Sequence, residues 1–291
     1  MLHYTPTPIQ EIQDPILDKA GVRLLIKRED INHSFVSGNK WWKLKYNLEE
    51  AQRLSKKILL TFGGAYSNHI YTTAGAAHEL GCKSIGIIRG EKTFPLNHTL
   101  SFAISKGMKL HYVTREQYRN KTESEFINRL YDLFGDFYLI PEGGTNTLAV
   151  TGCEELAKTL GHDFDYVCCS VGTGGTLAGL INGLPSNKKI LGFSSLKGGE
   201  FLVEEVKRWL NRSLNNWSII SDYHFGGYGK TPDELKKFTE AFYKSFSVPL
   251  DPVYTSKLVY GVWDLVAKNF FNPGATVLIL HSGGLQGKTL S

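Results

Sequence analysis

Short apolar runs alternate with longer amphipathic segments along most of the chain. The apolar runs predict strands, and the amphipathic segments, whose apolar residues recur at helical spacing, predict helices. The predicted strands cover residues 22–29, 57–64, 83–90, 109–114, 136–144, 165–175, 189–199, 217–223 and 275–284. The clearest predicted helices cover residues 41–54, 68–81, 116–135 and 148–161. This alternation predicts an α/β fold with parallel sheets covered by helices.

Glycine clusters follow five of the predicted strands. They read "FGGAYSNH", "PEGGTNT", "SVGTGGTLAG", "SLKGGE" and "HSGG". Ligands of parallel sheets bind at the carboxyl ends of the strands, where such loops lie. The sequence therefore predicts one site assembled from several strand exits. No Pro/Ser-rich linker separates two halves, so two domains are expected to interleave.

Composition narrows the function classes. The chain has 291 residues, enough for one large domain or two medium ones, with 21% charged residues and a formal charge of +5. The basic residues are scattered, so no nucleic-acid partner is expected. No apolar run is long enough to cross a membrane and no secretory leader is visible, which favours a cytoplasmic protein without a membrane partner. The four cysteines form no CxxC pair, and neither a disulfide nor a metal site is expected.

The stretch "DYVCCSVGTGGTLAGLING" predicts a strand, a glycine loop and a helix. The loop Gly172–Thr176 can turn backbone N–H groups toward a phosphate at the positive end of the helix dipole, and Thr173 and Thr176 can add hydroxyls. A tight turn that needs glycines only for its geometry is the alternative, and the anion site is favoured. A dinucleotide site is disfavoured because Leu177 occupies the last position of the GxGxxG pattern.

One lysine stands between turn-forming residues and bulky apolar ones in "SGNKWWKL", residues 37–44. In the first interpretation Trp41 and Trp42 pack on the core at a helix start, and Lys40 stays in solvent. In the second, apolar surroundings lower the pKa of Lys40, so that its amine is a nucleophile near neutral pH. This stretch alone favours the first interpretation.

Polar residues also stand at a predicted strand-to-helix junction. Ser67, Asn68 and His69 suit a helix cap, but a run of donors also suits a carboxylate or a phenolic oxygen. Tyr228 lies in a glycine-rich loop and Tyr254 just before another predicted helix. Each tyrosine alone is more typical of packing than of chemistry.

The order of these motifs resembles one family. "SGNKWWKL", "YSNHIYTTAGAAHELG", "SVGTGGTLAG", "GGYGKTPDEL", "DPVYTSK" and "HSGG" follow one another from about residue 27 to residue 284. In this order they resemble the 1-aminocyclopropane-1-carboxylate (ACC) deaminase/D-cysteine desulfhydrase family. Its members are pyridoxal 5'-phosphate (PLP) enzymes of the tryptophan synthase β-like fold, fold type II.

The resemblance implies two interleaved three-layer α/β/α domains. Residues 1–42 and 145–291 would form a larger PLP-binding domain, and residues 43–144 a smaller inserted one. The active site would lie in the cleft between them, where closure excludes water. Family members are usually homodimers, so a homodimer is expected.

The resemblance also implies roles for individual residues. Lys40 would form the Schiff base with PLP and move the proton at Cα of an amino-acid substrate. The cofactor phosphate would be bound by Lys43 and by Gly172, Thr173, Gly174, Gly175 and Thr176, the ring 3-hydroxyl by Asn68, and the pyridine nitrogen by Thr255. The substrate carboxylate would be bound by Ser67, Asn68 and His69. Tyr228 and Tyr254 would flank the substrate.

Departures within the family bear on the reaction. The ACC deaminase branch carries a glutamate where this chain has Thr255, and the "SNH" triplet resembles the desulfhydrase branch. A hydroxyl at the ring nitrogen makes a weaker electron sink than a carboxylate does, which favours α,β-elimination of a good leaving group over cyclopropane opening. The expected reaction therefore releases pyruvate, sulfide and ammonia from D-cysteine. Tyr66 stands where both branches commonly have glutamine.

Four alternatives stay open. They are an ACC deaminase, a serine dehydratase or racemase of the same fold, a nucleotide-binding oxidoreductase, and a non-catalytic binder of small molecules.

Overall fold

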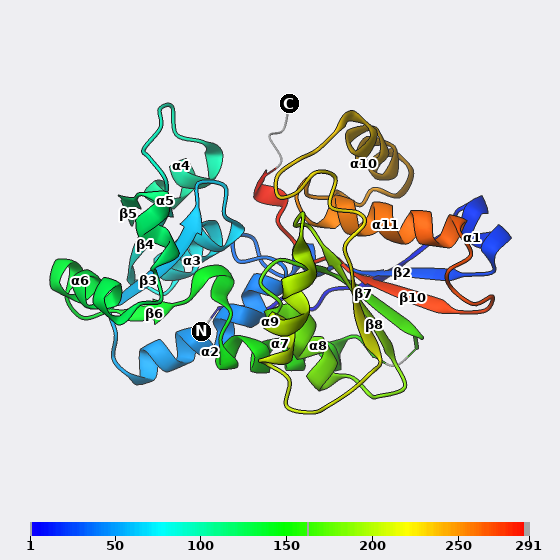
Figure 1. Ribbon diagram of the computed structural model, residues 1–291, viewed down its shortest axis with the longest axis horizontal. Coiled ribbons are helices and arrows are strands. Elements are labelled where there is room, and N and C mark those ends of the chain that lie inside the picture. Colours follow the sequence, from blue (N-terminus) through cyan, green and yellow to red (C-terminus); the bar gives the residue numbers. More distant parts are fainter. Residues whose placement is uncertain (1, 162, 288–291) are drawn as a thin grey trace.

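Two β-sheets form the centre of the protein, a computed structural model that describes residues 2–161 and 163–287 (Figure 1). The larger sheet contains, in spatial order, β1 (Ile9–Ile12), β2 (Arg23–Lys27), β10 (Thr276–Leu280), β7 (Tyr166–Val171), β8 (Lys189–Ser194) and β9 (Trp217–Ile220). The smaller sheet contains β5 (Met108–Val113), β4 (Lys83–Arg89), β3 (Ile58–Gly64) and β6 (Tyr138–Ile140). Neighbouring strands run parallel throughout, apart from the antiparallel pair β1 and β2.

Helices cover both sheets. In chain order they are α1 (Pro15–Ala20), α2 (Asn39–Arg53), α3 (Asn68–Glu79), α4 (His98–Ser105), α5 (Arg115–Arg119), α6 (Ser124–Phe134), α7 (Thr147–Thr159), α8 (Gly175–Gly183), α9 (Leu202–Lys207), α10 (Asp233–Phe246) and α11 (Thr255–Ala267). None of the helices within residues 2–161 and 163–287 combines the length and apolar character needed to cross a membrane.

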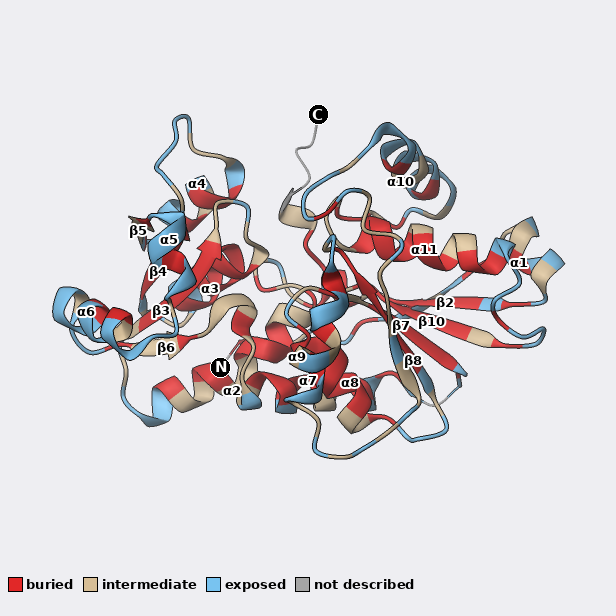
Figure 2. Ribbon diagram, in the orientation of Figure 1, coloured by how far each residue is buried: buried red, intermediate tan, exposed pale blue. Residues whose placement is uncertain are grey.

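The two faces of the larger sheet carry separate apolar cores. Helices α2, α7 and α8 pack together on one face, and α1 and α11 supply much of the core on the other. Figure 2 shows the buried faces of these helices turned toward the sheet. Trp41 and Trp42 are 7% and 5% exposed and pack against each other and Tyr4. For residues 37–44, the expectation that Trp41 and Trp42 pack on the core is therefore correct.

The predicted strands and the parallel α/β architecture are confirmed, with two differences. Strand β1 was not predicted, and it pairs antiparallel at the sheet edge. The single helix predicted over residues 116–135 is two helices, α5 and α6. Helix α5 begins with a capping box between Thr114 and Gln117 and ends at Asn120. The break lets Lys121 reach Glu142 beyond β6, a tertiary contact that local periodicity does not contain.

The domain boundaries stay a prediction. All four strands of the smaller sheet lie between residues 58 and 140, inside the segment expected to form the smaller domain. The expected boundary between residues 42 and 43 falls inside α2, which begins beside the larger sheet and runs toward the smaller one (Figure 1). The carboxyl-terminal ends of β3, β7 and β10 meet at the pocket described below.

Candidate active site

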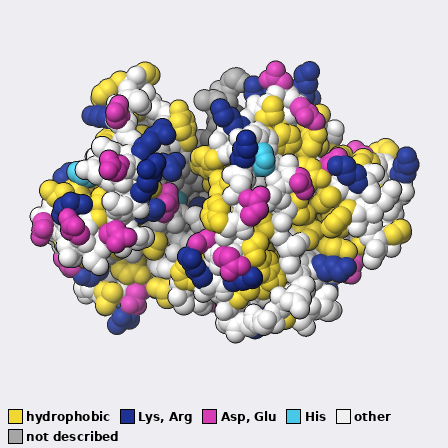
Figure 3. Space-filling model, viewed as in Figure 1, with side chains coloured by type: hydrophobic (Ala, Val, Ile, Leu, Met, Phe, Trp, Pro, Cys, Tyr) yellow, Lys and Arg dark blue, Asp and Glu magenta, His cyan; other side chains and the backbone are white. Residues whose placement is uncertain are grey.

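A pocket of about 680 Å³ lies where the strand exits of the two sheets meet. The space-filling view shows the corresponding hollow between the two halves of the molecule (Figure 3). The volume is typical of a site that binds a cofactor or another small molecule. The lining includes every predicted site residue apart from Thr255, namely Lys40, Lys43, Ser67, Asn68, His69, Gly172, Thr173, Gly174, Gly175, Thr176, Tyr228 and Tyr254. The structure thus brings these residues together, and their individual roles stay predictions.

The turn before Lys40 is fixed by a close crossing of two backbone segments. Gly38 has a φ of +73°, and a Cβ there would lie 1.9 Å from the carbonyl oxygen of Ser282. Its N–H donates to the carbonyl oxygen of Glu29 and to Oδ1 of Asn32, both at 2.9 Å. Only glycine combines this conformation with this approach. The glycine therefore fixes the start of α2, and with it Lys40, against the exit of β10.

A buried carboxylate stabilises this turn. Glu29 is fully buried and accepts hydrogen bonds from Thr7, Asn32 and the indole N–H of Trp42 at 2.6–2.9 Å. Lys27 completes the group with an ion pair at 3.6 Å. A buried charge is stable only when it is paired and hydrogen-bonded, as it is here. The tryptophan beside the lysine thus also anchors the turn.

The amine of Lys40 lies on the pocket and has few polar partners. Its Nζ donates to the carbonyl oxygen of Gly143 at 3.1 Å. Burial, which penalises the charged form, lowers the pKa of Lys40 to about 8, and the nearby Cys153 only partly offsets this. Both interpretations of the stretch therefore hold in part, because the tryptophans pack in the core while the lysine points into the pocket.

Lys43, one helical turn later, lies at the base of a cup of hydroxyl groups. Its Nζ donates to Gly143 O and Thr145 Oγ1 at 2.7 Å and to Thr173 Oγ1 at 3.3 Å. Burial and the charge of Lys40 hold the pKa of Lys43 well below its usual range. No carboxylate among the described residues forms an ion pair with it. A buried ammonium in this setting suits an anionic ligand.

The glycine loop closes this cup. Gly174, at φ +80°, precedes α8, and the first N–H groups of that helix have no partner within it. A Cβ on Gly175 would lie 2.8 Å from Thr145 Cγ2 and 3.2 Å from Lys43 Cε. Thr176 accepts from Asn39 at 2.7 Å, which leaves its own proton free. Free N–H groups, hydroxyls and a buried cation fit the phosphate group of PLP.

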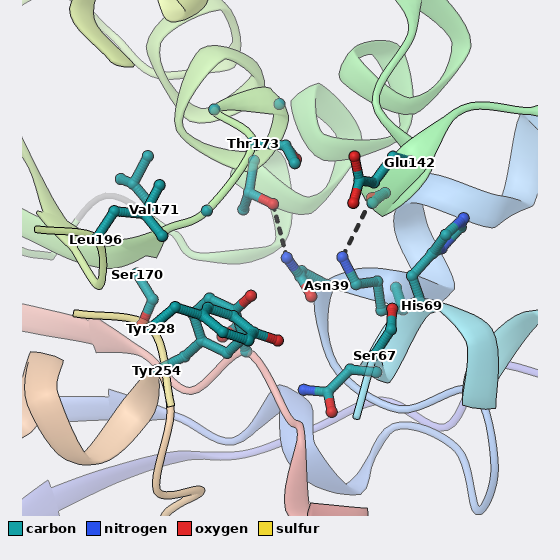
Figure 4. A pocket seen from close by; sticks show the side chains of 18 of the residues that line it. Asn39, Ser67, His69, Glu142, Ser170, Val171, Thr173, Leu196, Tyr228 and Tyr254 are labelled. Carbon is teal, nitrogen blue, oxygen red and sulfur yellow. Dashed lines mark hydrogen bonds between the residues drawn. The ribbon is translucent and has the colours of Figure 1, made fainter. Parts of the chain in front are cut away.

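The start of α3 forms a second anion-binding surface on the opposite wall. Ser67 caps the helix by accepting from the N–H of Ile70 at 3.3 Å, so its hydroxyl proton is free to donate. The N–H groups of Asn68 and His69 precede that bond and point out of the helix end. Figure 4 shows Ser67 across the pocket from Tyr228 and Tyr254. A substrate carboxylate fits this surface.

The bonding of the His69 ring bears on its predicted role at the substrate carboxylate. Its ring is 2% exposed, and Nε2 lies 2.7 Å from Thr61 Oγ1. Because Thr61 gives its proton to the carbonyl oxygen of Ile140, Nε2 is the donor in this contact. Burial and the nearby lysines lower the pKa of His69 well below its usual value, so the ring is neutral. The backbone N–H of His69, rather than Nε2, is therefore available for a carboxylate.

Two tyrosines form the wall opposite α3. The rings of Tyr228 and Tyr254 lie 5.9 Å apart with an interplanar angle of 70°. Burial raises the pKa of both phenols, so both carry their protons at neutral pH. Lys257 holds the loop of Tyr228 by donating to the carbonyl oxygens of His224 and Gly227 at 2.9 and 2.8 Å. The pair can donate hydrogen bonds or a proton into the pocket.

Thr255 is the predicted residue that the structure does not place on the pocket. It is fully buried at the start of α11. Its hydroxyl donates to Asp251 Oδ2 at 2.8 Å and accepts from the N–H of Asp251 at 2.7 Å. The Asp251 carboxylate also accepts from the N–H of Thr255, so both residues are bonded to each other at the start of α11, and this geometry gives no support to a role at the ring nitrogen. Ser282, at the exit of β10, lines the pocket instead.

The sequence predictions missed several polar residues of the site. They include Thr145, whose hydroxyl accepts from Lys43 in the cup, and Ser282, Arg89 and Glu142, which line the pocket. Each follows or ends a strand of the structure, so the rule that sites lie at strand exits contained the signal. Choosing these residues among many polar ones at such exits required the tertiary arrangement.

Comparisons with known proteins agree with this geometry. Residues 1–283 match the family model described as "Pyridoxal-phosphate dependent enzyme". A Pyrococcus abyssi protein named putative 1-aminocyclopropane-1-carboxylate deaminase is 32% identical, covering 97% of this chain and 90% of that protein. An Arabidopsis thaliana protein is 30% identical over 98% of this chain and 78% of its own length, and is named bifunctional D-cysteine desulfhydrase/1-aminocyclopropane-1-carboxylate deaminase, mitochondrial.

A solved structure supports the same assignment. The crystal structure of an ACC deaminase homologue superposes with a TM-score of 0.82 at 28% identity, covering 99% of this chain and 92% of that one. The expected fold, tryptophan synthase β-like fold type II, is therefore confirmed, and PLP is the cofactor. With its lysine, phosphate cup and strand-exit pocket in one place, the chain belongs to the family of pyridoxal-phosphate-dependent enzymes.

Proposed function

We propose that this enzyme catalyses α,β-elimination from a small amino acid that carries a leaving group on Cβ. D-Cysteine is the favoured substrate, and the products are pyruvate, sulfide and ammonia. When bound, PLP withdraws electrons from Cα of the amino acid attached to it. The observation that carries the proposal is the low pKa of Lys40 in a pocket that also contains the anion-binding starts of α8 and α3.

Lys40 supplies the base. With a pKa of about 8, about one-tenth of this amine is neutral at pH 7, compared with about one in three thousand for a lysine at the ordinary value of 10.5. A neutral amine can attach the cofactor and then take the proton from Cα. Its bond to Gly143 O aims the nitrogen into the pocket.

The start of α3 orients the substrate. The Ser67 hydroxyl and the free N–H groups of Asn68 and His69 hold the carboxylate, so that one face of Cα meets Lys40. Positioning of this kind can supply several kcal/mol of the barrier reduction. On the other wall, Tyr228 and Tyr254 keep their protons at neutral pH, and one of them can protonate the departing thiolate.

The charges around the pocket favour elimination over ring opening. Two carboxylates line the pocket among the described residues, and both are in ion pairs, Glu142 with Lys121 and Glu205 with Arg208. Neither is free to keep the ring nitrogen protonated. Expulsion of thiolate needs less stabilisation of charge at Cα than cyclopropane opening does, because the leaving group departs with the electrons. ACC deaminase activity is the second candidate, since relatives carry that name.

A panel of substrates tests the proposal. Sulfide and pyruvate are measured from D-cysteine, 2-oxobutyrate from ACC, and pyruvate from D- and L-serine, each with the wild type and with Lys40→Ala. We expect turnover of D-cysteine that the substitution abolishes. Turnover of ACC without turnover of D-cysteine would replace elimination with ring opening, and turnover of serine alone would favour a dehydratase.

A further inference from the structure

Arg89, the last residue of β4, is a cation on the pocket that the proposed reaction does not use. Four cationic side chains line the pocket in the part of the chain that the structure describes. Lys40 and Lys43 donate to Gly143, and Lys121 pairs with Glu142. Arg89 is exposed and makes no hydrogen bond or ion pair with any residue that the structure describes. Its charge is therefore available to a ligand.

The guanidinium of Arg89 is held close to the substrate-binding surface. Its Nη2 lies 3.5 Å from the position that a Cβ on Gly64 would occupy, and Gly64 ends the strand that leads to Ser67. The ring of Tyr118 lies beneath it, with its centroid 5.6 Å from Cζ. The charge of Arg89 also acts on the phenol of Tyr228, which lies on the opposite wall. The cation thus lies on the pocket beside the end of the strand that leads to α3, within electrostatic range of Tyr228.

The neighbouring carboxylate does not neutralise this cation. Glu142 Oε1 accepts from the hydroxyl of Tyr118 at 2.8 Å, and Oε2 pairs with Lys121 at 3.2 Å. Both carboxylate oxygens are therefore occupied, and the negative charge is balanced by Lys121. The net charge left on this wall is that of Arg89. Figure 3 shows Lys and Arg side chains gathered along the side of the hollow that belongs to the smaller sheet.

We propose that Arg89 binds an acidic group on the substrate's side chain, so that the enzyme favours amino acids whose Cβ leaving group carries a carboxylate or a similar anion. This proposal rests on the proposed elimination at the same site. The α-carboxylate occupies the start of α3, and the second acid meets the planar donor face of the guanidinium. For a carboxylate-bearing thioether, the Cα–H and Cβ–S bonds break and the thiol leaves with a proton. Water then converts the remaining enamine to pyruvate and ammonia.

A pair of substrates that differ in charge but hardly in shape tests the proposal. S-Carboxymethyl-D-cysteine carries the acid, and S-carbamoylmethyl-D-cysteine carries a neutral amide of the same size. We expect kcat/KM of the PLP-loaded wild type to favour the acid by about tenfold or more. In Arg89→Gln the ratio is expected to fall to within about twofold of one, whereas Arg129→Gln on the exposed face of α6 should retain it.

Two outcomes of this assay overturn the proposal. If the wild type has nearly equal kcat/KM values for the acid and the amide, the pocket does not bind an acidic group on the substrate's side chain. Equal losses for both substrates in Arg89→Gln assign the arginine to the α-carboxylate instead.

A binding measurement separates this proposal from the elimination reaction. D-Glutamate and D-glutamine have no leaving group on Cβ, and calorimetry on the PLP-loaded protein gives their dissociation constants. A preference for D-glutamate that disappears in Arg89→Gln supports the acid site even if no substrate is eliminated. Elimination from D-cysteine without any preference for D-glutamate leaves the reaction standing and refutes the site.

Discussion

Replacing Lys40 by methionine is expected to stabilise the cofactor-free protein at neutral pH. The fold lowers the pKa of this amine from 10.5 to about 8, a shift of about 2.5 units. At 1.36 kcal/mol per unit, the buried ammonium costs about 3 kcal/mol at pH 7. Methionine keeps most of the side-chain volume, and Lys43 still donates to the carbonyl oxygen that Lys40 contacts. The penalty should therefore be relieved without opening a cavity.

The same shift fixes the pH dependence of this difference. Between pH 8 and 10.5 the unfolded chain holds a proton on Lys40 that the folded chain has released, so wild-type stability rises with pH across this window. The advantage of Lys40→Met is expected to fall from about 3 kcal/mol at pH 7 to about 1 kcal/mol at pH 9.5. Titrating groups that do not feel the charge of Lys40 are the same in both proteins, so their effects cancel in the difference. The pKa values of Lys43 and His69 are lowered by that charge, so its removal adds to the advantage of Lys40→Met.

Urea unfolding of the cofactor-free proteins, followed by circular dichroism at several pH values, measures this difference. Lys83→Met, at an exposed lysine that begins β4, is the control, and a change of less than about 0.5 kcal/mol is expected for it. If Lys40→Met and the control behave alike from pH 7 to 10, burial does not lower the pKa of Lys40, and the account of the base is wrong.

Four further substitutions test separate parts of the site. Gly174→Ala places a Cβ at a residue with a φ of +80°, 2.9 Å from Val206 Cγ2. It should weaken PLP binding about tenfold in a fluorescence titration and leave the circular dichroism spectrum unchanged. Unaltered affinity would show that the loop is only a structural turn. Thr255→Val should cost about 1–3 kcal/mol of stability and leave the absorbance of bound PLP unchanged, because its hydroxyl bonds Asp251. Ser282 lines the pocket, and if its hydroxyl bonds the ring nitrogen in place of Thr255, Ser282→Ala should shift that absorbance. The reverse pattern would restore Thr255 to the ring nitrogen. Lys257→Met removes the two hydrogen bonds that position the loop of Tyr228 and should lower kcat about tenfold with little change in KM. An unchanged kcat would show that the loop keeps its position without the lysine.

The sequence was sufficient for the architecture because apolar periodicity is local. Strand β7 and the loop at Gly172–Thr176 were predictable from one continuous stretch, in which the strand, the glycines and the helix follow in order. Strand β1 was missed because an edge strand buries little apolar surface, and only one of its four residues is buried here. The break between α5 and α6 was missed because a long-range contact of Lys121 with Glu142 accompanies it.

Residues of the site were predictable only where side chains suited to the chemistry stand next to turn or helix signals in the sequence. The turn, the lysine and the two tryptophans made Lys40 a candidate, and the resemblance in motif order assigned it to the cofactor. Its low pKa depends on burial that the sequence does not show. Thr255 was assigned to the cofactor from its position after a tyrosine. That assignment came from the resemblance. The hydroxyl of Thr255 bonds the backbone N–H and the carboxylate of Asp251, a local arrangement that the Asp-x-x-x-Thr spacing also permits. Arg89 could not be identified from the sequence as the residue for a second acid. Its proposed role depends on having no carboxylate partner, which only the tertiary structure shows.

Reduction of the PLP-loaded enzyme with borohydride, followed by peptide mass spectrometry, tests the central claim most directly. That claim is that Lys40 is the amine that attaches the cofactor, with Lys43 reserved for its phosphate. We predict that the phosphopyridoxyl group is found on Lys40 and that Lys40→Ala binds PLP without a reducible bond. Modification of Lys43 or of a lysine outside the pocket, or a reducible bond that persists in Lys40→Ala, would contradict the account.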